Sequence, residues 1–307
     1  MTNPTPVKTN HTTTYPAINP LLPALSSASK NILITGAGTG IGRATALSFA
    51  KSSASNIALL GRRTPQLEAT AHLIETSYPA TKTHIYPVDI TDLPALQRVF
   101  KSYTTSIAGP IHTLIANAGI HPGYSTVSTL PNNHLSSSLT TNVLGTANTL
   151  QALTPHIPAE PDSTGYKARV IHVSSAVSHI QFPGASAYSV AKAAAAKLVE
   201  FYALENPDLW VLNLHPGVVE TELEGSGRLR ADVDVSLPAD FTVWAASPES
   251  SFLGSGRLIW VHWDVDELRE LFDRYKSGEV KDGAEIMGGL PVHKNFTLGL
   301  LGWNGRV

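Results

Sequence analysis

Two side chains that could exchange a proton stand four residues apart in this chain. Tyr188 and Lys192 lie in the string YSVAK, inside an alanine-rich stretch that favours helix. Residues four apart share one face of a helix, so the lysine ammonium would stand beside the tyrosine phenol. A phenol with the ordinary pKa of about 10 is a poor proton donor at neutral pH, but a neighbouring positive charge favours its phenolate form. The pair could therefore act as a general acid or base.

Three further polar motifs precede this pair. Ser175 ends the apolar run VIHVSS, thirteen residues before Tyr188. Asn117-Ala118-Gly119 closes another apolar run, and Asn142-Val-Leu-Gly145 falls within a helical stretch. Each has an ordinary structural explanation, because serine is common where a strand ends and a buried asparagine often satisfies backbone groups. None of these motifs alone therefore indicates a chemical role, and each must be judged together with the others.

A glycine-rich turn could bind a phosphate group. The string TGAGTGIG, residues 35–42, follows an apolar run and opens a helical pattern. Gly36 and Gly40 allow tight backbone geometry, and Gly42 lets the helix pack close to the strand. The helix N-terminus would offer unpaired N–H groups and partial positive charge to a pyrophosphate. A plain turn is the alternative.

Short apolar runs alternate with helical patterns from residue 31 onward, which predicts βαβ units. The expected strands are 32–35, 57–60, 84–88, 113–116, 170–174, 210–215 and 257–262. The expected helices are 41–52, 64–77, 92–106, 132–153, 186–205 and 238–247, with right-handed crossovers. We therefore expect an α/β protein with a Rossmann-type, doubly wound, seven-stranded parallel sheet and helices on both faces.

The ends of the chain differ in texture from its middle. Residues 1–29, rich in Thr, Pro, Asn and Ser, predict an irregular N-terminal extension. Residues 30–263 would form a single Rossmann-type domain, and 264–307 a C-terminal helix and tail. Asp264 can cap that helix, with Glu267 at the reciprocal position of a capping box.

The composition excludes several classes of protein. With 22 Lys and Arg, 24 Asp and Glu, and no basic run, the chain is not expected to bind nucleic acid or an anionic membrane. The absence of cysteine removes thiolate chemistry and fits a cytoplasmic location. No apolar run approaches the roughly 20 residues of a membrane-spanning helix. The 12 histidines show no metal-binding pattern, so no metal is expected.

Taken together, these motifs resemble the short-chain dehydrogenase/reductase family, in its main NADP(H)-preferring branch. The family carries T-G-x-x-x-G-x-G, N-A-G, N-x-x-G, and a serine thirteen residues before Y-x-x-x-K, and this chain matches them in order over about residues 31–221. The resemblance implies hydride transfer from a nicotinamide to a carbonyl, with Tyr188 protonating the oxygen and Ser175 positioning it. Asn142 would help hold a water that connects Lys192 to solvent.

The resemblance also implies a cofactor site. Its expected residues are Gly36, Thr39, Gly40, Ile41, Arg62, Asp89, Ile90, Asn117, Tyr188, Lys192, Pro216, Gly217, Val219 and Thr221. The second strand ends in Gly61-Arg62-Arg63, without the acid that would bind a ribose 2′-hydroxyl. Arg62 could instead meet a 2′-phosphate, which favours NADP(H); a solvated arginine is the alternative. Asp89 matches an adenine-contacting position, although it could cap the next helix, a role for which Asp92 is better placed.

The substrate pocket is expected beyond the carboxyl ends of the strands. Segments 121–129, 177–183 and a mobile lid at about 218–246, with the string LEGSGRL, would line it. Its candidate residues are Val177, Phe182, Val218 and Trp244, although Phe241 and Trp244 could instead be helix packing.

The expected reaction is NADPH-dependent reduction of a small, apolar ketone or aldehyde. The alternatives are alcohol oxidation, double-bond reduction, epimerisation, or NADP binding without turnover. The small residues after Tyr188 would permit close approach of another helix, and family members commonly pair through this helix into homodimers or homotetramers. Alanine is also simply a good helix former, which is the alternative. The leader YPAINP and the string VHWDVDEL resemble fungal members linked to secondary metabolism.

Overall fold

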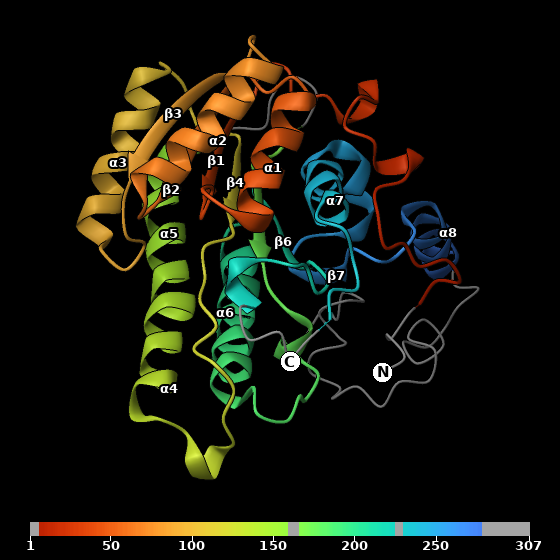
Figure 1. Cartoon of the computed structure of the whole chain (residues 1–307). Coiled ribbons are helices and arrows are strands. Elements are labelled where there is room, and N and C mark those ends of the chain that lie inside the picture. The colour runs from red at the N-terminus through yellow and green to blue at the C-terminus, as the bar shows by residue number, and fades with distance from the viewer. Residues whose placement is uncertain (1–5, 159–165, 225–229, 278–307) are drawn as a thin grey trace.

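The computed structural model describes residues 6–158, 166–224 and 230–277. Within them, a parallel seven-stranded sheet has the order β3-β2-β1-β4-β5-β6-β7 (Figure 1). The strands are β1 Asn31–Thr35, β2 Asn56–Gly61, β3 Lys82–Pro87, β4 Thr113–Ala116, β5 Arg169–Val173, β6 Trp210–His215 and β7 Arg257–Trp260. The predicted fold class is confirmed, and the order reverses between β1 and β4.

Helices connect and cover these strands. They are α1 Gly40–Lys51, α2 Thr64–Ser77, α3 Leu93–Ser106, α4 Asn132–Ser138, α5 Gly145–Leu153, α6 Ser186–Glu205, α7 Ser236–Ala246 and α8 Val265–Lys276. The single helix expected over 132–153 is interrupted by a π-helical turn at Leu139–Leu144, which contains Asn142. Such turns often mark functional sites.

Two layers of helices sandwich the sheet. Because successive strand residues point to opposite faces, Ile32 and Ile34 join one hydrophobic cluster while Leu33 joins the other. The first cluster includes residues of α1, α2, α7 and α8. The second includes residues of α3, α5 and α6. All five residues of β1 are buried, as expected for a central strand covered on both faces.

The crossover from β6 to β7 departs from the expected right hand. α7 packs against α1 on the same face of the sheet. The β1-α1-β2 connection runs toward β3, whereas β6-α7-β7 runs toward the other edge, so the two have opposite hands. The second is left-handed, and the right-handed expectation is wrong there. Because α6 already covers the other face, α7 covers a face that would otherwise be bare.

The N-terminal segment is irregular but packed. Residues 6–25, here called the N-terminal strap, contain the 3₁₀ turns Pro16–Ile18 and Pro23–Leu25 and run beside α7 and α8 (Figure 1). The backbone N–H of His11 donates to the carbonyl of His262 at 2.7 Å. Ile18 and Leu25 are fully buried in the first hydrophobic cluster. The strap therefore belongs to the same core as the sheet.

The start of α8 confirms one of the two expected helix caps. Oδ1 of Asp264 accepts hydrogen bonds from the N–H groups of Asp266 and Glu267, at 3.1 and 3.0 Å. The expected capping-box role of Glu267 is wrong, because its carboxylate binds the strap. It accepts from the N–H groups of Lys8 and Thr9, at 2.6 and 3.1 Å. Of the expected C-terminal tail, residues 278–307 lie outside the described residues.

We expect the strap to contribute to stability through its buried side chains. Ile18→Ala should lower the free energy of unfolding by about 2–4 kcal/mol, because the truncation leaves a cavity in the first cluster. Leu21→Ala is the control, since that side chain is 65% exposed and lies three residues away. Urea unfolding of both variants measures the effect, and equal stability of the two would contradict it.

Candidate active site

The glycine-rich turn has the geometry that its sequence predicts. Gly36 and Gly40 adopt φ values of +69° and +52°, which other residues rarely adopt. A Cβ atom on Gly42 would lie 2.6 Å from Nδ2 of Asn117, so no side chain fits between α1 and the end of β4. The Arg43 guanidinium donates to the carbonyl of Gly38 and braces the turn.

Asn117 ties the end of β4 to this turn. Its Nδ2 donates to the carbonyls of Thr35 and Gly36, at 3.0 and 3.3 Å. Its backbone N–H donates to Oγ1 of Thr35 at 3.0 Å. The asparagine therefore fixes the switch point of the sheet, where open α/β sheets bind their ligands.

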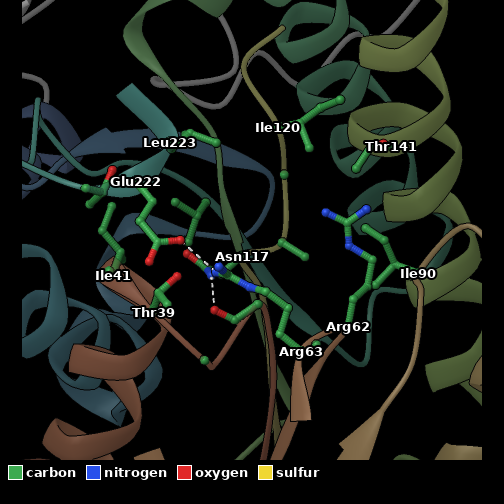
Figure 2. Close-up of a pocket in the computed structure, with 18 of the residues that line it drawn as sticks. Thr39, Ile41, Arg62, Arg63, Ile90, Asn117, Ile120, Thr141, Glu222 and Leu223 are labelled. Carbon is green, nitrogen blue, oxygen red and sulfur yellow. Dashed lines mark hydrogen bonds and ion pairs between the residues drawn. The ribbon is translucent and has the colours of Figure 1, made fainter. Parts of the chain in front are cut away.

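A cleft of about 460 Å³ opens at this point, a volume typical of small-molecule sites (Figure 2). Most of the expected cofactor residues line it: Gly36, Thr39, Gly40, Ile41, Arg62, Asp89, Ile90, Asn117, Tyr188, Lys192, Pro216 and Thr221. Gly217 and Val219 do not line it. Gly217 has φ +76° and a Cβ there would lie 2.6 Å from Cγ2 of Val233, while Val219 is buried in the first cluster.

The two arginines at the edge of the cleft, Arg62 and Arg63, each face a carboxylate from another segment of the chain. Figure 2 shows Arg63 joined to Glu222 across the cleft, with their Nη2 and Oε2 atoms 2.7 Å apart. Nη1 of Arg62 lies 3.9 Å from Oδ2 of Asp89, and the Arg62 side chain is 70% exposed. Glu222 comes from the segment after β6, so the fold supplies acids that the end of β2 lacks.

The structure assigns the cap of α3 to Asp92, whereas Asp89 lines the cleft. Oδ1 of Asp92 accepts from the N–H of Ala95 at 2.9 Å and caps α3. Oδ1 of Asp89 accepts from the N–H of Thr91 at 2.9 Å, and its side chain lines the cleft. Asp89 is therefore left for the cleft.

The tyrosine and lysine occupy one buried face of α6. Nζ of Lys192 donates to the carbonyl of Val173 at 2.7 Å and lies 5.8 Å from the centroid of the Tyr188 ring. Both side chains line the cleft. Burial lowers the pKa of Lys192 to about 8. The neighbouring His172 is also buried; burial and then the Lys192 charge lower its pKa to about 3, so it stays neutral.

Asn142 and Ser175 do not line the cleft, although their chain neighbours Thr141 and Ser174 do. Oδ1 of Asn142 accepts from the N–H of Ile120 at 2.8 Å, and its Nδ2 donates to the Ile120 carbonyl at 2.9 Å. A Cβ on Gly119 would lie 3.0 Å from Oδ1 of Asn142 and 3.7 Å from Nζ of Lys192, so the two side chains meet around that glycine. Ser175 is half-buried and begins the 3₁₀ turn Ala176–Ser178.

None of the four expected substrate residues is among those that line the cleft. Val177 and Phe182 are half-buried on the segment after Ser175. Val218 is half-buried, and its N–H donates to Oδ1 of Asp232 at 2.7 Å. Trp244 is only 2% exposed and packs against Phe241, with ring centroids 4.9 Å apart, so its pocket role is corrected to helix packing.

The expected lid at 218–246 is too long. Residues 236–246 form α7, whose buried face packs on α1, and cannot act as a mobile cover. Within LEGSGRL, residues 225–229 lie outside the described part of the chain.

Several residues of the site were not named from the sequence. Ile120, Thr141, Glu222 and Leu223 line the cleft, and each lies within two residues of a motif residue in the chain. That adjacency was the available signal. The ring of His121 lies 4.7 Å from the Tyr188 ring, a contact that only the fold creates.

Within residues 6–158, 166–224 and 230–277, no group of three or more His, Cys, Asp or Glu side chains could hold a metal ion. No helix in the same ranges is long and apolar enough to cross a membrane.

Comparisons with known proteins agree with this geometry. A family profile described as "short chain dehydrogenase" matches residues 30–231. A short chain dehydrogenase/reductase of Claviceps purpurea is 34% identical over 280 residues, covering 88% of this chain and 90% of that one. One from Aspergillus aculeatus is 30% identical over 292 residues, covering 94% and 97%. The expected resemblance to fungal members linked to secondary metabolism is confirmed.

Among solved structures, a 3-ketoacyl-(acyl-carrier-protein) reductase from Brucella melitensis, complexed with NADH, has a TM-score of 0.68. It is 22% identical and covers 77% of this chain and 98% of that one. This likeness shows a shared fold.

The buried lysine predicts a pH-dependent contribution to stability. Between pH 8 and 10.5, the unfolded chain keeps a proton on Lys192 that the folded chain has released, because the pKa falls from 10.5 to about 8 on folding. Stability therefore rises with pH in this window. The wild type should gain at most about 3 kcal/mol relative to Lys192→Met. Denaturant unfolding at several pH values measures the difference, and parallel profiles would contradict it.

Proposed function

Since the chain belongs to the short-chain dehydrogenase/reductase family, we propose that it is an NADPH-dependent enzyme that reduces a ketone or aldehyde of a small, apolar metabolite. The observation that carries the proposal is that Tyr188 and Lys192 line the same cleft as the glycine-rich turn. A proton donor and a phosphate-binding turn thus face one volume, as hydride transfer coupled to protonation requires.

The residues of the cleft fit a dinucleotide. Gly40 and Thr39 at the start of α1 offer backbone to a pyrophosphate, and the helix dipole favours negative charge there. Pro216 and Thr221, after β6, line the same cleft as Tyr188 and would border the nicotinamide. When bound, the nicotinamide supplies a hydride to the carbonyl carbon.

The protein supplies the proton and the orientation. Tyr188 donates its phenolic proton to the carbonyl oxygen, which Ser175 holds by a hydrogen bond. Lys192 favours the phenolate that remains, and with a pKa of about 8 it can itself exchange a proton near neutral pH. Asn142 holds the segment after β4 through Ile120, and its expected role in retaining a water remains part of the proposal. Run in reverse, the same residues would oxidise an alcohol.

The preference for NADP(H) rests on Arg62. The end of β2 carries no acid for a ribose hydroxyl, and Arg62 lines the cleft with its side chain 70% exposed. Its contact with Asp89, at 3.9 Å, is long and solvent-exposed, so it is worth at most about 1 kcal/mol. A phosphate could therefore displace Asp89. The Brucella reductase named above holds NADH, so the preference is specific to this proposal.

An exposed apolar stripe supports the proposed homodimer or homotetramer. Val190, Phe201 and Leu204 on α6 are 53%, 50% and 76% exposed, and their spacing places them along one side of the helix. Large apolar side chains gathered on a surface commonly mark protein interfaces. A cytoplasmic location stays a prediction from the sequence.

The first test removes the proton donor. Tyr188→Phe should lower kcat for NADPH-dependent ketone reduction by about 10²–10⁴-fold, because the ring stays but the hydroxyl is lost. NADPH binding, followed by fluorescence titration, should survive. Turnover of carbonyls or alcohols that depends on Tyr188 would exclude the binding-only alternative. Unchanged NADPH oxidation across a ketone panel would rule out the proposed mechanism.

The second test concerns the cofactor. Arg62→Ala should weaken NADPH binding by about tenfold and leave NADH binding nearly unchanged, because only NADPH carries the 2′-phosphate. Arg98→Ala is the control, because it removes the same positive charge from an exposed position on α3. Fluorescence titration with both cofactors measures the ratio. Equal wild-type affinities, or a ratio that Arg62→Ala does not alter, would reject the argument.

A further inference from the structure

Three aromatic side chains form a chain of ring contacts that begins at Tyr188. The ring centroid of His121 lies 4.7 Å from that of Tyr188 and 4.6 Å from that of Tyr124. The Tyr124 and Phe182 centroids are 6.0 Å apart. We call His121, Tyr124 and Phe182 the aromatic wall. It starts at the proposed proton donor and extends away from it.

Backbone contacts hold the wall together from two distant segments. The N–H of Ser125 donates to the carbonyl of Gly184 at 2.7 Å, and Ser125 forms a parallel bridge with Ala185. These contacts lie next to Tyr124 and within three residues of Phe182, so they fix the spacing of the two rings. The wall is therefore built by the fold.

A hydrogen bond to the His121 ring, the one next to Tyr188, defines which of its nitrogens carries the proton in the neutral form. Nδ1 of His121 accepts the N–H of Gly123 at 3.2 Å, so in the neutral ring the proton is on Nε2. His121, Tyr124 and Phe182 are each half-buried, so part of each ring surface faces outward. Rings in this state can still pack against a ligand.

The segments that carry the wall have no formal charge. Residues 102–159 and residues 170–191 contain no Asp, Glu, Lys or Arg. A ligand that touches this side of Tyr188 therefore meets aromatic faces, amides and hydroxyls. Recognition there must come from ring packing and hydrogen bonds.

We propose that the aromatic wall makes the enzyme select ketones whose carbonyl is conjugated to, or fused with, an aromatic ring. Aromatic pairs in edge-to-face or offset geometry gain beyond their buried area, by about two- to tenfold in affinity for each pair. Tyr124 and Phe182 are the specificity-determining residues, and His121 links them to Tyr188. This inference rests on the proposed carbonyl reductase function.

The test compares 1-tetralone with 1-decalone, which share a carbon skeleton and differ in one aromatic ring. Binding to the complex with NADP⁺ is measured by calorimetry, where the oxidised cofactor cannot reduce either ketone. The wild type should bind 1-tetralone about tenfold more tightly, since two or more wall rings can contact it. In the double variant Tyr124→Leu, Phe182→Leu, the ratio should fall to within about twofold of one.

Two controls keep the outcome interpretable. Tyr78→Leu removes a half-buried ring that follows α2 and packs against the first hydrophobic cluster rather than in the wall, and should leave the ratio unchanged. Tyr124→Phe keeps the ring and should keep the ratio. The single variants Tyr124→Leu and Phe182→Leu should each lower the ratio, which tests the wall if the double variant fails to fold. Equal wild-type binding of the two ketones, or a tenfold ratio that persists without both rings, would overturn the inference.

Turnover separates the two proposals. If the wild type reduces ketones but binds 1-tetralone and 1-decalone alike, the wall proposal fails and the reductase stands. If 1-tetralone binds selectively through the wall but is not reduced, and no other carbonyl is, the reductase proposal fails instead.

Discussion

The buried contact between Lys192 and the carbonyl of Val173 is the interaction on which the site depends. It joins α6 to the carboxyl end of β5 at 2.7 Å and satisfies an ammonium that burial would otherwise penalise. Tyr188 lies one turn earlier on α6, and Ser175 lies two residues beyond Val173, so this contact ties the helix that carries Tyr188 to the strand end that precedes Ser175. The pKa of about 8 for Lys192 follows from the same burial. One side chain thus both anchors α6 to β5 and carries the lowered pKa.

The other half of the cleft depends on close backbone approach. Gly36, Gly42 and Asn117 meet where no Cβ could be added, and Asn117 binds the backbone at Thr35 and Gly36. This arrangement leaves the start of α1 facing the cleft. On the rim, Arg62 and Arg63 face Asp89 and Glu222, so positive charge there is offset by carboxylates from other segments. These ion pairs are exposed and therefore cost little to separate.

On the face of the sheet that α1 covers, α7, α8 and the N-terminal strap pack together. The left-handed β6-α7-β7 connection brings α7 onto α1, and the N-terminal strap then covers α7 and α8. His11 pairs with Asp264 at 2.8 Å, and Thr14 donates to Asp240 at 2.7 Å, so polar contacts align the strap while Ile18 and Leu25 anchor it. The aromatic wall lies beside Tyr188, through the contact of its His121 ring.

The sequence by itself determined the alternation of strands and helices, the glycine turn, and the presence of Tyr188 and Lys192 on one helical face, because these depend on local periodicity and spacing. It could not determine that Glu267 binds the strap, that Trp244 is buried, or that the last crossover is left-handed, since each depends on which distant segment packs alongside. The same holds for Glu222 opposite Arg63 and for His121 against Tyr188. Contacts between residues far apart in the chain are fixed only when the sheet brings the ends of its strands to one edge, and that decision belongs to the tertiary structure.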